Sequence, residues 1–236
     1  MYWQVAKNSL QYRLKSFFIN TVSACENTSE LVSFRHKETP LMEYNVEVKL
    51  LAITPDAENL AEQAGRLCYA SGNKLGSSQD WLQTRIKQGH ESLLEHVSAT
   101  FYIKASRVVT HELVRHRIGS YSQRSQRYVK ENQAEFITPP EIAEEDSAKL
   151  ALFNQAMESA WDSYRKLLEA GIKPEIARYV LPNACATEII CTWNFRELRH
   201  ILKLRTAPSA QPEMRVVANL IQEILKKEAP KIFGDL

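Results

Sequence analysis

The chain has 236 residues, of which 44% are hydrophobic and 25% are charged, and its formal net charge is +2 at pH 7. This is the composition of an ordinary globular protein, and it excludes a disordered chain, a collagen-like fibre and a low-complexity tail. The sequence contains no run of 18 apolar residues, so we predict no membrane-spanning helix, and the low net charge argues against a nucleic-acid or membrane partner.

The first 41 residues differ from the rest of the chain. They include apolar residues such as Trp3 and Phe17 but no sustained period of two or 3.6 residues. Their apolar run at residues 17–19 is too short for the h-region of a signal peptide. A strand-like alternation begins just after Met42. We therefore expect residues 1–41 to be an N-terminal extension outside the core fold and residues 42–236 to form a single domain.

Helices and strands are mixed along residues 42–236 without a regular βαβ alternation. Apolar alternation predicts strands over 45–54 and 97–104, and a run rich in β-branched and apolar residues predicts a third strand over 185–193. Residues 118–126 are predicted to form a loop. Helices are predicted over 56–69, 77–89, 106–117, 141–170, 194–204 and 212–228, with a short one that begins at Pro174 and is ended by Pro182. This order favours the α+β class within the broader α/β group, with a twisted central β-sheet flanked by helices.

The low net charge hides two arginine-rich segments. Residues 107–127 hold five arginines and one acid, which gives +4 in 21 residues, and residues 196–205 hold four basic residues against Glu197. Because the planar guanidinium grips phosphate oxygens with two parallel hydrogen bonds and stays charged, these segments predict an anion-binding site. The simpler alternative is a solvated basic face that pairs with acids elsewhere.

Neither a metal site nor a glycine-rich phosphate loop is predicted. The stretch His111–His116 has one residue too many for the zinc motif HExxH, so its two histidines would lie about 140° apart around a helix. His90 and His96 are six residues apart and fail in a similar way. The chain has only seven glycines and no G-x-G-x-x-G or P-loop, so side-chain guanidinium groups would have to hold the phosphates of any nucleotide.

Within the first arginine-rich segment, Arg115-His116-Arg117 is followed after seven residues by Ser125, which reproduces the signature R-H-R-x7-S. On this signature and on collinear segments elsewhere, the chain resembles the flavin-dependent thymidylate synthases over most of residues 44–230. The collinear segments are Gly89–His96, Ala177–Pro182, Trp193–Arg196, Leu204–Arg205 and Ala210–Glu213.

The resemblance implies a methyltransferase that converts dUMP to dTMP in an α/β fold. Methylenetetrahydrofolate would supply the carbon, reduced FAD would supply the hydride, and NADPH would reduce the FAD again. The resemblance also implies a homotetramer whose active sites are shared between chains. A cytoplasmic location is expected, because the four cysteines show no CxxC spacing and a chain of this size needs no disulfide.

Carried over residue by residue, the resemblance assigns two groups of site residues. The FAD group is His90, Ser92, Arg115, His116, Arg117, Gln123, Asn194, Arg196 and His200. The dUMP group is Glu112, Gln123, Ser125, Arg127, Arg178 and Arg205, with Gln123 between the two ligands and His90 near flavin and folate. The family often has Asn-Glu where this chain has Ser122-Gln123, and Glu112 replaces a more usual glutamine.

Arg205 is our candidate catalytic residue on physical grounds as well. Uracil C5 becomes nucleophilic only when negative charge develops on the O4–C4–N3 face, and a fixed cation stabilises that charge in a dry site. A covalent mechanism is the alternative, but Cys185 and Cys191 lie in an apolar run that would raise the pKa of a thiol. We interpret Ser125 as a ligand contact and not as a nucleophile.

Two other functions remain open at this point. The first is a basic nucleotide- or RNA-binding domain without catalysis, in which Tyr121 or Tyr128 stacks on bases. The second is a related flavoenzyme with a different substrate.

Overall fold

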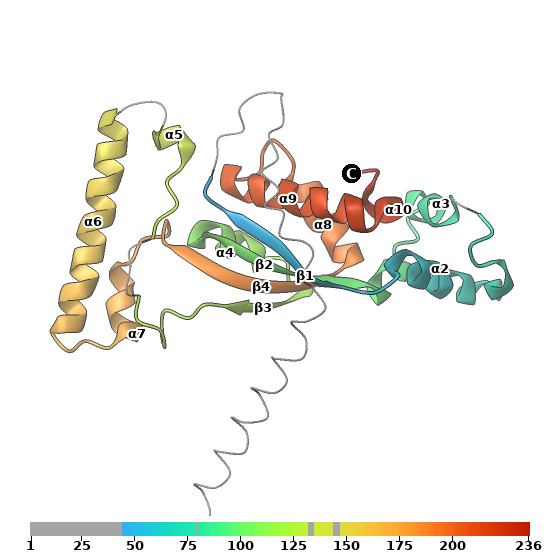
Figure 1. The fold of residues 1–236 in the computed structure, drawn as a ribbon, viewed down its shortest axis with the longest axis horizontal. Helices are drawn as coiled ribbons and strands as arrows, with labels where there is room; N and C mark the ends of the chain where they lie inside the picture. Colours follow the sequence, from blue (N-terminus) through green and yellow to red (C-terminus); the bar gives the residue numbers. More distant parts are fainter. Residues whose placement is uncertain (1–43, 79, 132–134, 144–146) are drawn as a thin grey trace, which may run out of the picture. The chain divides into compact units, whose positions relative to one another are not determined.

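The computed structural model describes residues 44–78, 80–131, 135–143 and 147–236. The predicted extension over residues 1–41 lies outside this part of the chain and stays a prediction. Within the described residues, helices flank one antiparallel sheet, so the predicted α+β class is confirmed (Figure 1).

The sheet has four strands in the order β1-β2-β4-β3. These are β1 (Glu47–Ile53), β2 (Ser98–Ser106), β3 (Gly119–Gln123) and β4 (Ala186–Asn194). Every pairing is antiparallel, and β2 and β4 are paired along their whole length, from Ser98 opposite Asn194 to Ser106 opposite Ala186. The two central strands therefore join segments that lie about 90 residues apart in the sequence.

Strict alternation along β2 and β4 gives the sheet one apolar and one polar face. Phe101, Ile103, Ile189 and Trp193 are at most 1% exposed and belong to the main core. Figure 1 shows α8 (Phe195–Arg205) and α9 (Pro212–Glu228) running along the sheet, and both helices contribute to this core. The other face carries polar pairs, such as the hydroxyls of Thr100 and Thr192, 2.9 Å apart.

Helix α4 (Arg107–Leu113) begins directly after β2, and its start is fixed by two partners of Ser106. The Ser106 hydroxyl caps the helix by accepting from the backbone N–H of Val109 at 3.4 Å. The backbone N–H and the hydroxyl of Ser106 both donate to the buried carboxylate of Glu213 on α9, at 2.8 and 2.6 Å. These contacts hold α4, which leads into the R-H-R segment, in a defined position against α9.

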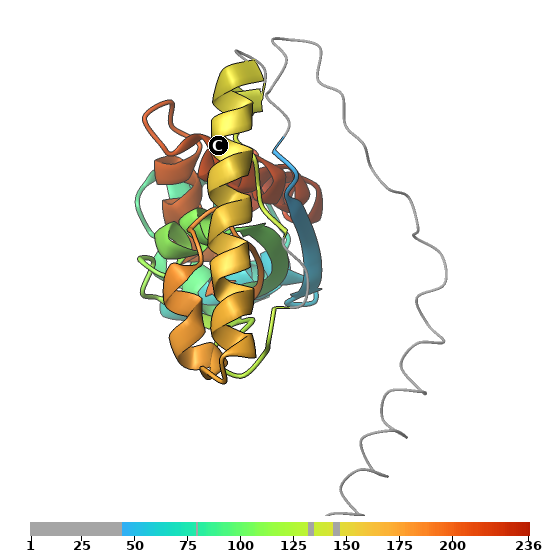
Figure 2. The same ribbon diagram turned by 90° about the vertical axis from the view of Figure 1, so that its left-hand side faces the viewer.

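The remaining helices lie toward the two ends of the sheet. α2 (Ala57–Cys68), α3 (Trp81–Lys87) and the 3₁₀ segments η2 (Gly72–Lys74) and η3 (Ser92–His96) lie on the side of α10 (Pro230–Phe233). On the opposite side, α6 (Ser147–Glu169) packs against α7 (Pro174–Ala177) and the 3₁₀ segment η4 (Arg178–Val180), around Trp161 and Tyr164 (Figure 2). Gly171, with φ of +83°, adopts the left-handed conformation just after α6.

The structure differs from the sequence prediction in several elements: η2 and η3 were not predicted, and α4 ends at Leu113 and not at residue 117. Part of the predicted loop 118–126 is the edge strand β3, because β4 offers a free edge to which even the polar sequence Gly-Ser-Tyr-Ser-Gln can pair. The short helix α10 was not expected. The single helix expected over 141–170 is described as α5 (Pro140–Ala143) and α6, with residues 144–146 outside the described part.

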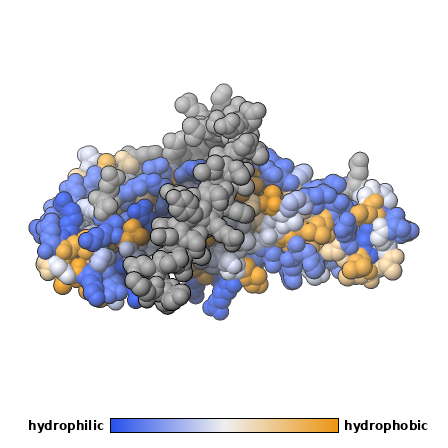
Figure 3. All heavy atoms as spheres, turned by 60° about the horizontal axis from the view of Figure 1, so that its bottom comes forward, coloured by the Kyte–Doolittle hydropathy of each residue, from blue (hydrophilic) through white to orange (hydrophobic). Residues whose placement is uncertain are grey.

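The surface view in Figure 3 shows hydrophilic residues interleaved with separate apolar patches on the visible face. None of the helices in the described residues is long and apolar enough to cross a membrane.

Candidate active site

Three of the predicted site residues meet where the last turns of α4 and α8 lie together. The Nε of Arg205 donates to Nε2 of His116 at 3.0 Å, and its Nη1 donates to the Glu112 carboxylate at 2.5 Å. The Arg205 side chain is 19% exposed, so it is largely shielded from water. Two contacts at different edges fix the plane of the guanidinium as well as its position.

The imidazole of His116 is buried and neutral. Burial, and next the charge of Arg205, lower the pKa of His116 to about 4. A guanidinium Nε–H can only donate, so Nε2 of His116 must be the acceptor and the ring proton lies on Nδ1. Nδ1 is 3.3 Å from the carboxylate of Glu197, and the His200 ring lies edge-on with its centroid 5.9 Å away.

The turn that carries Arg115-His116-Arg117 is tied to the sheet through Tyr121. The Tyr121 hydroxyl accepts from the indole N–H of Trp193 at 2.8 Å and lies within donating distance of the backbone carbonyls of His116 and Leu113. Burial raises the pKa of Tyr121, so the hydroxyl keeps the proton that it donates. Trp193 also packs over Gly119, where an added Cβ would lie 2.4 Å from the indole Cδ1.

The side chains of Arg115 and Arg117, on either side of His116, are exposed. Within the described ranges neither guanidinium has an ion-pair partner, in contrast to Arg205. Ile118, the next residue, lines a cavity of about 500 Å³ together with Glu91, Glu95, Asn194, Arg196, Glu197 and His200. Arg196 forms an ion pair with Glu95, and Asn194 caps α8 by accepting from the backbone N–H of Glu197 at 2.8 Å.

His90 and Ser92 line a second cavity, of about 260 Å³, with the aromatic residues Tyr69 and Trp81. The Arg85 guanidinium lies over both rings, 5.5 Å and 5.4 Å from their centroids. Its Nε is buried and finds no hydrogen-bond partner among the described residues. This cavity therefore combines aromatic rings that contact guanidinium groups with a buried donor that has no partner among the described residues.

Two of the predicted dUMP residues, Arg127 and Arg178, contact Glu175 in α7. Arg127 forms an ion pair with Glu175 at 3.1 Å, and Nε of Arg178 donates to the backbone carbonyl of Glu175 at 3.2 Å. The Ser125 hydroxyl accepts from the backbone N–H of Arg127 at 3.1 Å. Gln123 lies at the end of β3, where its amide nitrogen donates to the hydroxyls of Thr110 and Thr187 at 3.1 and 3.4 Å.

Arg107 is a site candidate that was not singled out from the sequence. Burial lowers the pKa of this guanidinium, its Nε has no partner among the described residues, and Nη2 donates to the backbone carbonyl of Arg124 at 3.4 Å. It lies close enough to Arg178 for the two charges to repel. The sequence signal was its place in the first arginine-rich segment, directly after the helix cap Ser106.

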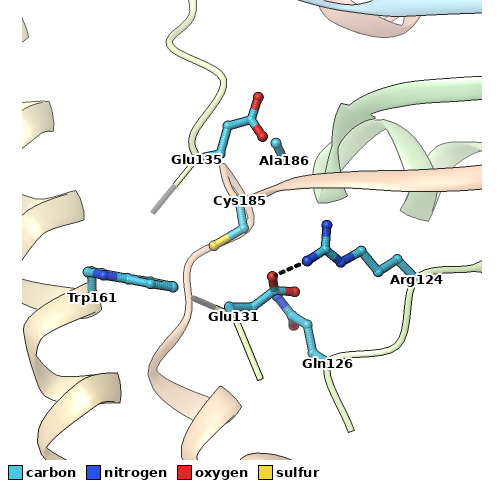
Figure 4. Close-up of a pocket in the computed structure, with 7 residues that line it drawn as sticks. All are labelled: Arg124, Gln126, Glu131, Glu135, Trp161, Cys185 and Ala186. Atoms are coloured by element: carbon cyan, nitrogen blue, oxygen red, sulfur yellow. Dashed lines mark ion pairs between the residues drawn. The ribbon is translucent and has the colours of Figure 1, made fainter. Parts of the chain in front are cut away.

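A cavity of about 350 Å³ is lined by residues from the same region (Figure 4): Arg124, Gln126, Glu131, Glu135, Trp161, Cys185 and Ala186. Arg124 and Glu131 form an ion pair across it, at 3.2 Å. Burial raises the pKa of the Cys185 thiol to about 11 and that of Cys191 to about 12, so both thiols stay protonated near neutral pH. A thiolate nucleophile is therefore disfavoured at either residue.

The second arginine-rich segment only partly fits the expected anion site. Arg199 is buried, donates to the Asp235 carboxylate at 2.6 and 2.7 Å and to the backbone carbonyl of Ile232, and so joins α8 to the C-terminal end of the chain. Its guanidinium thus has a structural role.

Comparison with known proteins decides the family. The model of the family described as "Thymidylate synthase complementing protein" matches residues 49–231. The chain belongs to this family. A flavin-dependent thymidylate synthase of Clostridium tetani is 40% identical over 80% of this chain and 85% of its own length, and one of Geobacter sulfurreducens is 42% identical over 80% and 86%. The resemblance inferred from the R-H-R-x7-S signature is therefore confirmed.

A solved structure with a similar fold supports this family assignment. The crystal structure of a UMP/dUMP methylase, PolB from Streptomyces cacaoi bound with 5-Br dUMP, superposes with a TM-score of 0.72 at 28% sequence identity. The match covers 81% of this chain and 94% of that chain.

Proposed function

We propose that this protein is a flavin-dependent thymidylate synthase that reductively methylates dUMP to dTMP. Family membership supports the reaction, and the single structural observation that carries it is the Arg205 guanidinium, fixed by His116 and Glu112. A nucleic-acid-binding domain without catalysis is not favoured, because its phosphate contacts would not call for a shielded arginine held in one plane.

Arg205 is the proposed catalytic residue. In a site from which water is excluded, a cation whose orientation is already fixed stabilises negative charge on the uracil ring without having to reorganise during the reaction. Neutral His116 supports this role, because it accepts a hydrogen bond from Arg205 and adds no competing positive charge. Glu112 is the second residue that orients the guanidinium.

Arg127 and Arg178 are proposed to hold the dUMP phosphate, with Ser125 beside them. Both arginines contact Glu175, whose side chain and backbone position them at one end of α7. We add Arg107 to this group, since its buried Nε is an unused donor near Arg178. Gln123 is held by Thr110 and Thr187 and is proposed to lie between the substrate and the cofactor.

The described residues fit FAD as cofactor. Arg115 and Arg117 are exposed and have no ion-pair partner among the described residues, so their guanidinium groups can bind a pyrophosphate. The adjoining cavity combines Asn194, Arg196 and His200 with the apolar Ile118. We propose that these residues and His116 hold the flavin, with His90 and Ser92 from the neighbouring cavity. When bound, the flavin supplies the hydride for the reaction.

Methylenetetrahydrofolate is the proposed carbon donor and NADPH the proposed reductant of the flavin. The cavity at His90 supports a planar co-substrate, since Tyr69, which is 58% exposed, offers a ring on which a fused ring can stack. We also propose a cytoplasmic homotetramer. Tyr128 and Tyr179, next to Arg127 and Arg178, are 76% and 82% exposed, which suits contact with a second chain near the substrate site.

The proposed function is tested by the release of the C5 hydrogen from dUMP labelled with tritium at that position. The purified protein, supplied with FAD, NADPH and methylenetetrahydrofolate, should release tritium and form dTMP, and the protein should be yellow. A colourless protein that cannot be reconstituted with FAD would contradict the proposal, and so would a yellow protein that transfers the methyl group to a different pyrimidine nucleotide.

A further inference from the structure

Glu197 lies directly behind His116, on the side of the imidazole opposite Arg205. It is in the first turn of α8, and its backbone N–H is held by the Asn194 cap. The residue is 7% exposed, and its carboxylate lies 3.3 Å from Nδ1 of the neutral His116. Burial raises the pKa of Glu197 as well. A buried carboxylate is costly unless a hydrogen bond satisfies it, so this contact has a physical reason to persist.

The imidazole therefore forms a bridge between an acceptor and a donor. Arg205 donates to Nε2, which leaves the ring proton on Nδ1, where it points toward Glu197. The position of the proton on a neutral histidine is set by the hydrogen bond that its other nitrogen makes. If the proton moved to Nε2, two N–H groups would face each other and the contact with Arg205 would be lost.

We propose that Glu197 is a positioning residue for the methylation of dUMP: by accepting the Nδ1 proton of His116, it keeps Nε2 available to Arg205 and so fixes the orientation of the guanidinium. This inference rests on the proposed function. Glu197 acts through His116, and its carboxylate is not itself placed against the substrate.

The other charged groups around the imidazole agree with this arrangement. Burial is the main reason why a charged His116 is disfavoured; Arg205 and His200 add to this effect, and Glu112 opposes it. Glu112 does not replace Glu197, because its carboxylate contacts Nη1 of Arg205. Within the described residues, Glu197 is therefore the acceptor that faces Nδ1.

Three substitutions separate the parts of the proposal. Glu197→Gln keeps an oxygen that can accept from Nδ1, so we expect the Nδ1–H form of His116 and a turnover within twofold of wild type. Glu197→Leu removes the acceptor, so we expect the proton to move to Nε2 and turnover to fall about tenfold. Glu197→Asp retains the charge but withdraws it by one methylene group, and it should behave like Glu197→Leu even if the leucine variant fails to fold.

Two measurements are needed, and one of them requires no activity. The ¹⁵N spectrum of histidine-labelled protein reports which ring nitrogen of His116 carries the proton, with the signal assigned by its loss in His116→Gln. Turnover is measured by tritium release from dUMP. As a matched control, Glu62→Gln changes a carboxylate that is also 7% exposed but pairs with Arg66, and it should leave the His116 signal unchanged.

An Nδ1–H signal that persists in Glu197→Leu or Glu197→Asp would overturn the proposal, and so would a Glu197→Gln variant as impaired as the other two. Failure of the proposed function looks different. In that case the wild-type protein releases no tritium, while the spectra of the variants still show whether Glu197 fixes the proton on His116.

Discussion

Two arginines on α8 and two that follow α4 come from arginine-rich segments of the sequence but differ in their surroundings. Arg199 and Arg205 on α8 are shielded, and each is bound to a carboxylate of this chain. Arg115 and Arg117 after α4 are exposed and, in the described part of the chain, have no ion-pair partner. Of these four arginines, only Arg199 and Arg205 therefore have side-chain orientations that contacts within the chain fix before a ligand binds.

The two kinds of arginine have different energetic consequences. A shielded guanidinium loses its hydration when the chain folds, and its partners must offset that loss, so its removal affects the folded state or the geometry of the site. An exposed guanidinium keeps its hydration and loses part of it only when an anion binds. Substitution of a shielded arginine should therefore change the free energy of unfolding or the turnover, whereas substitution of an exposed arginine should change the affinity for an anionic ligand.

The largest effect is expected for Arg205→Lys. A lysine keeps the charge but offers a point donor without the planar fork that contacts both His116 and Glu112. We expect turnover to fall at least about 100-fold, the size found when one preorganised donor is removed from an active site. Tritium release from dUMP measures the loss, and flavin absorbance should change little. Arg215→Lys, in α9, is the control, and a loss below fivefold for Arg205→Lys would contradict the catalytic assignment.

Arg199→Leu should lower the free energy of unfolding by about 2 kcal/mol, less than for a fully buried pair because Asp235 is 42% exposed. Urea denaturation measures this, while turnover per folded chain should stay within twofold of wild type. Arg199 holds the pKa of Asp235 below its usual value. The stabilisation from this pair is therefore complete above the ordinary aspartate pKa of about 4 and is lost as the pH falls through the lowered value. If the difference in the free energy of unfolding between wild type and Arg199→Leu grew as the pH was lowered, the Arg199–Asp235 pair would not be the source of that difference.

The smallest effect on stability is expected for Arg115→Gln. Because the side chain is exposed, the free energy of unfolding should stay within about 0.5 kcal/mol of wild type. Flavin affinity should fall about tenfold, since a charge-assisted hydrogen bond to a phosphate is lost. Titration followed by flavin absorbance measures the affinity, and Arg165→Gln on α6 provides an exposed control away from the site. Unchanged flavin affinity would remove Arg115 from the proposed cofactor site.

The sheet and its helices follow from the sequence wherever burial imposes a period. Alternation around Phe101 predicts β2, and the apolar and β-branched residues around Ile189 predict β4, because the side chains on one face of these strands enter the core. Strand β3 could not be predicted in this way. Its residues are exposed or half-buried, and it becomes a strand because β4 presents unpaired backbone groups, which is a tertiary cause that local composition does not carry.

The residues of the candidate site were likewise only partly predictable from the sequence. The R-H-R-x7-S signature indicates the family, and with it Arg205 and His116. The resemblance does not indicate Glu197, which counted in the sequence only as an acid that offsets basic neighbours. Its importance depends on the packing of the α4 end against α8, which brings its carboxylate to Nδ1 of His116, 81 positions away in the sequence. Contacts of this kind arise from helix packing and leave no local motif.

The contact of Gly119 with Trp193 has a consequence for how the family can vary. A side chain at position 119 would enter the space of the indole, and the backbone carbonyl of Thr192, 3.2 Å from the added Cβ, restricts it on another side. Because β3 and β4 are paired in register at these two residues, the collision cannot be relieved by a shift of one strand alone. Positions 119 and 193 should therefore evolve as a pair of nearly constant combined volume, with a bulky residue at the first accompanied by a small one at the second.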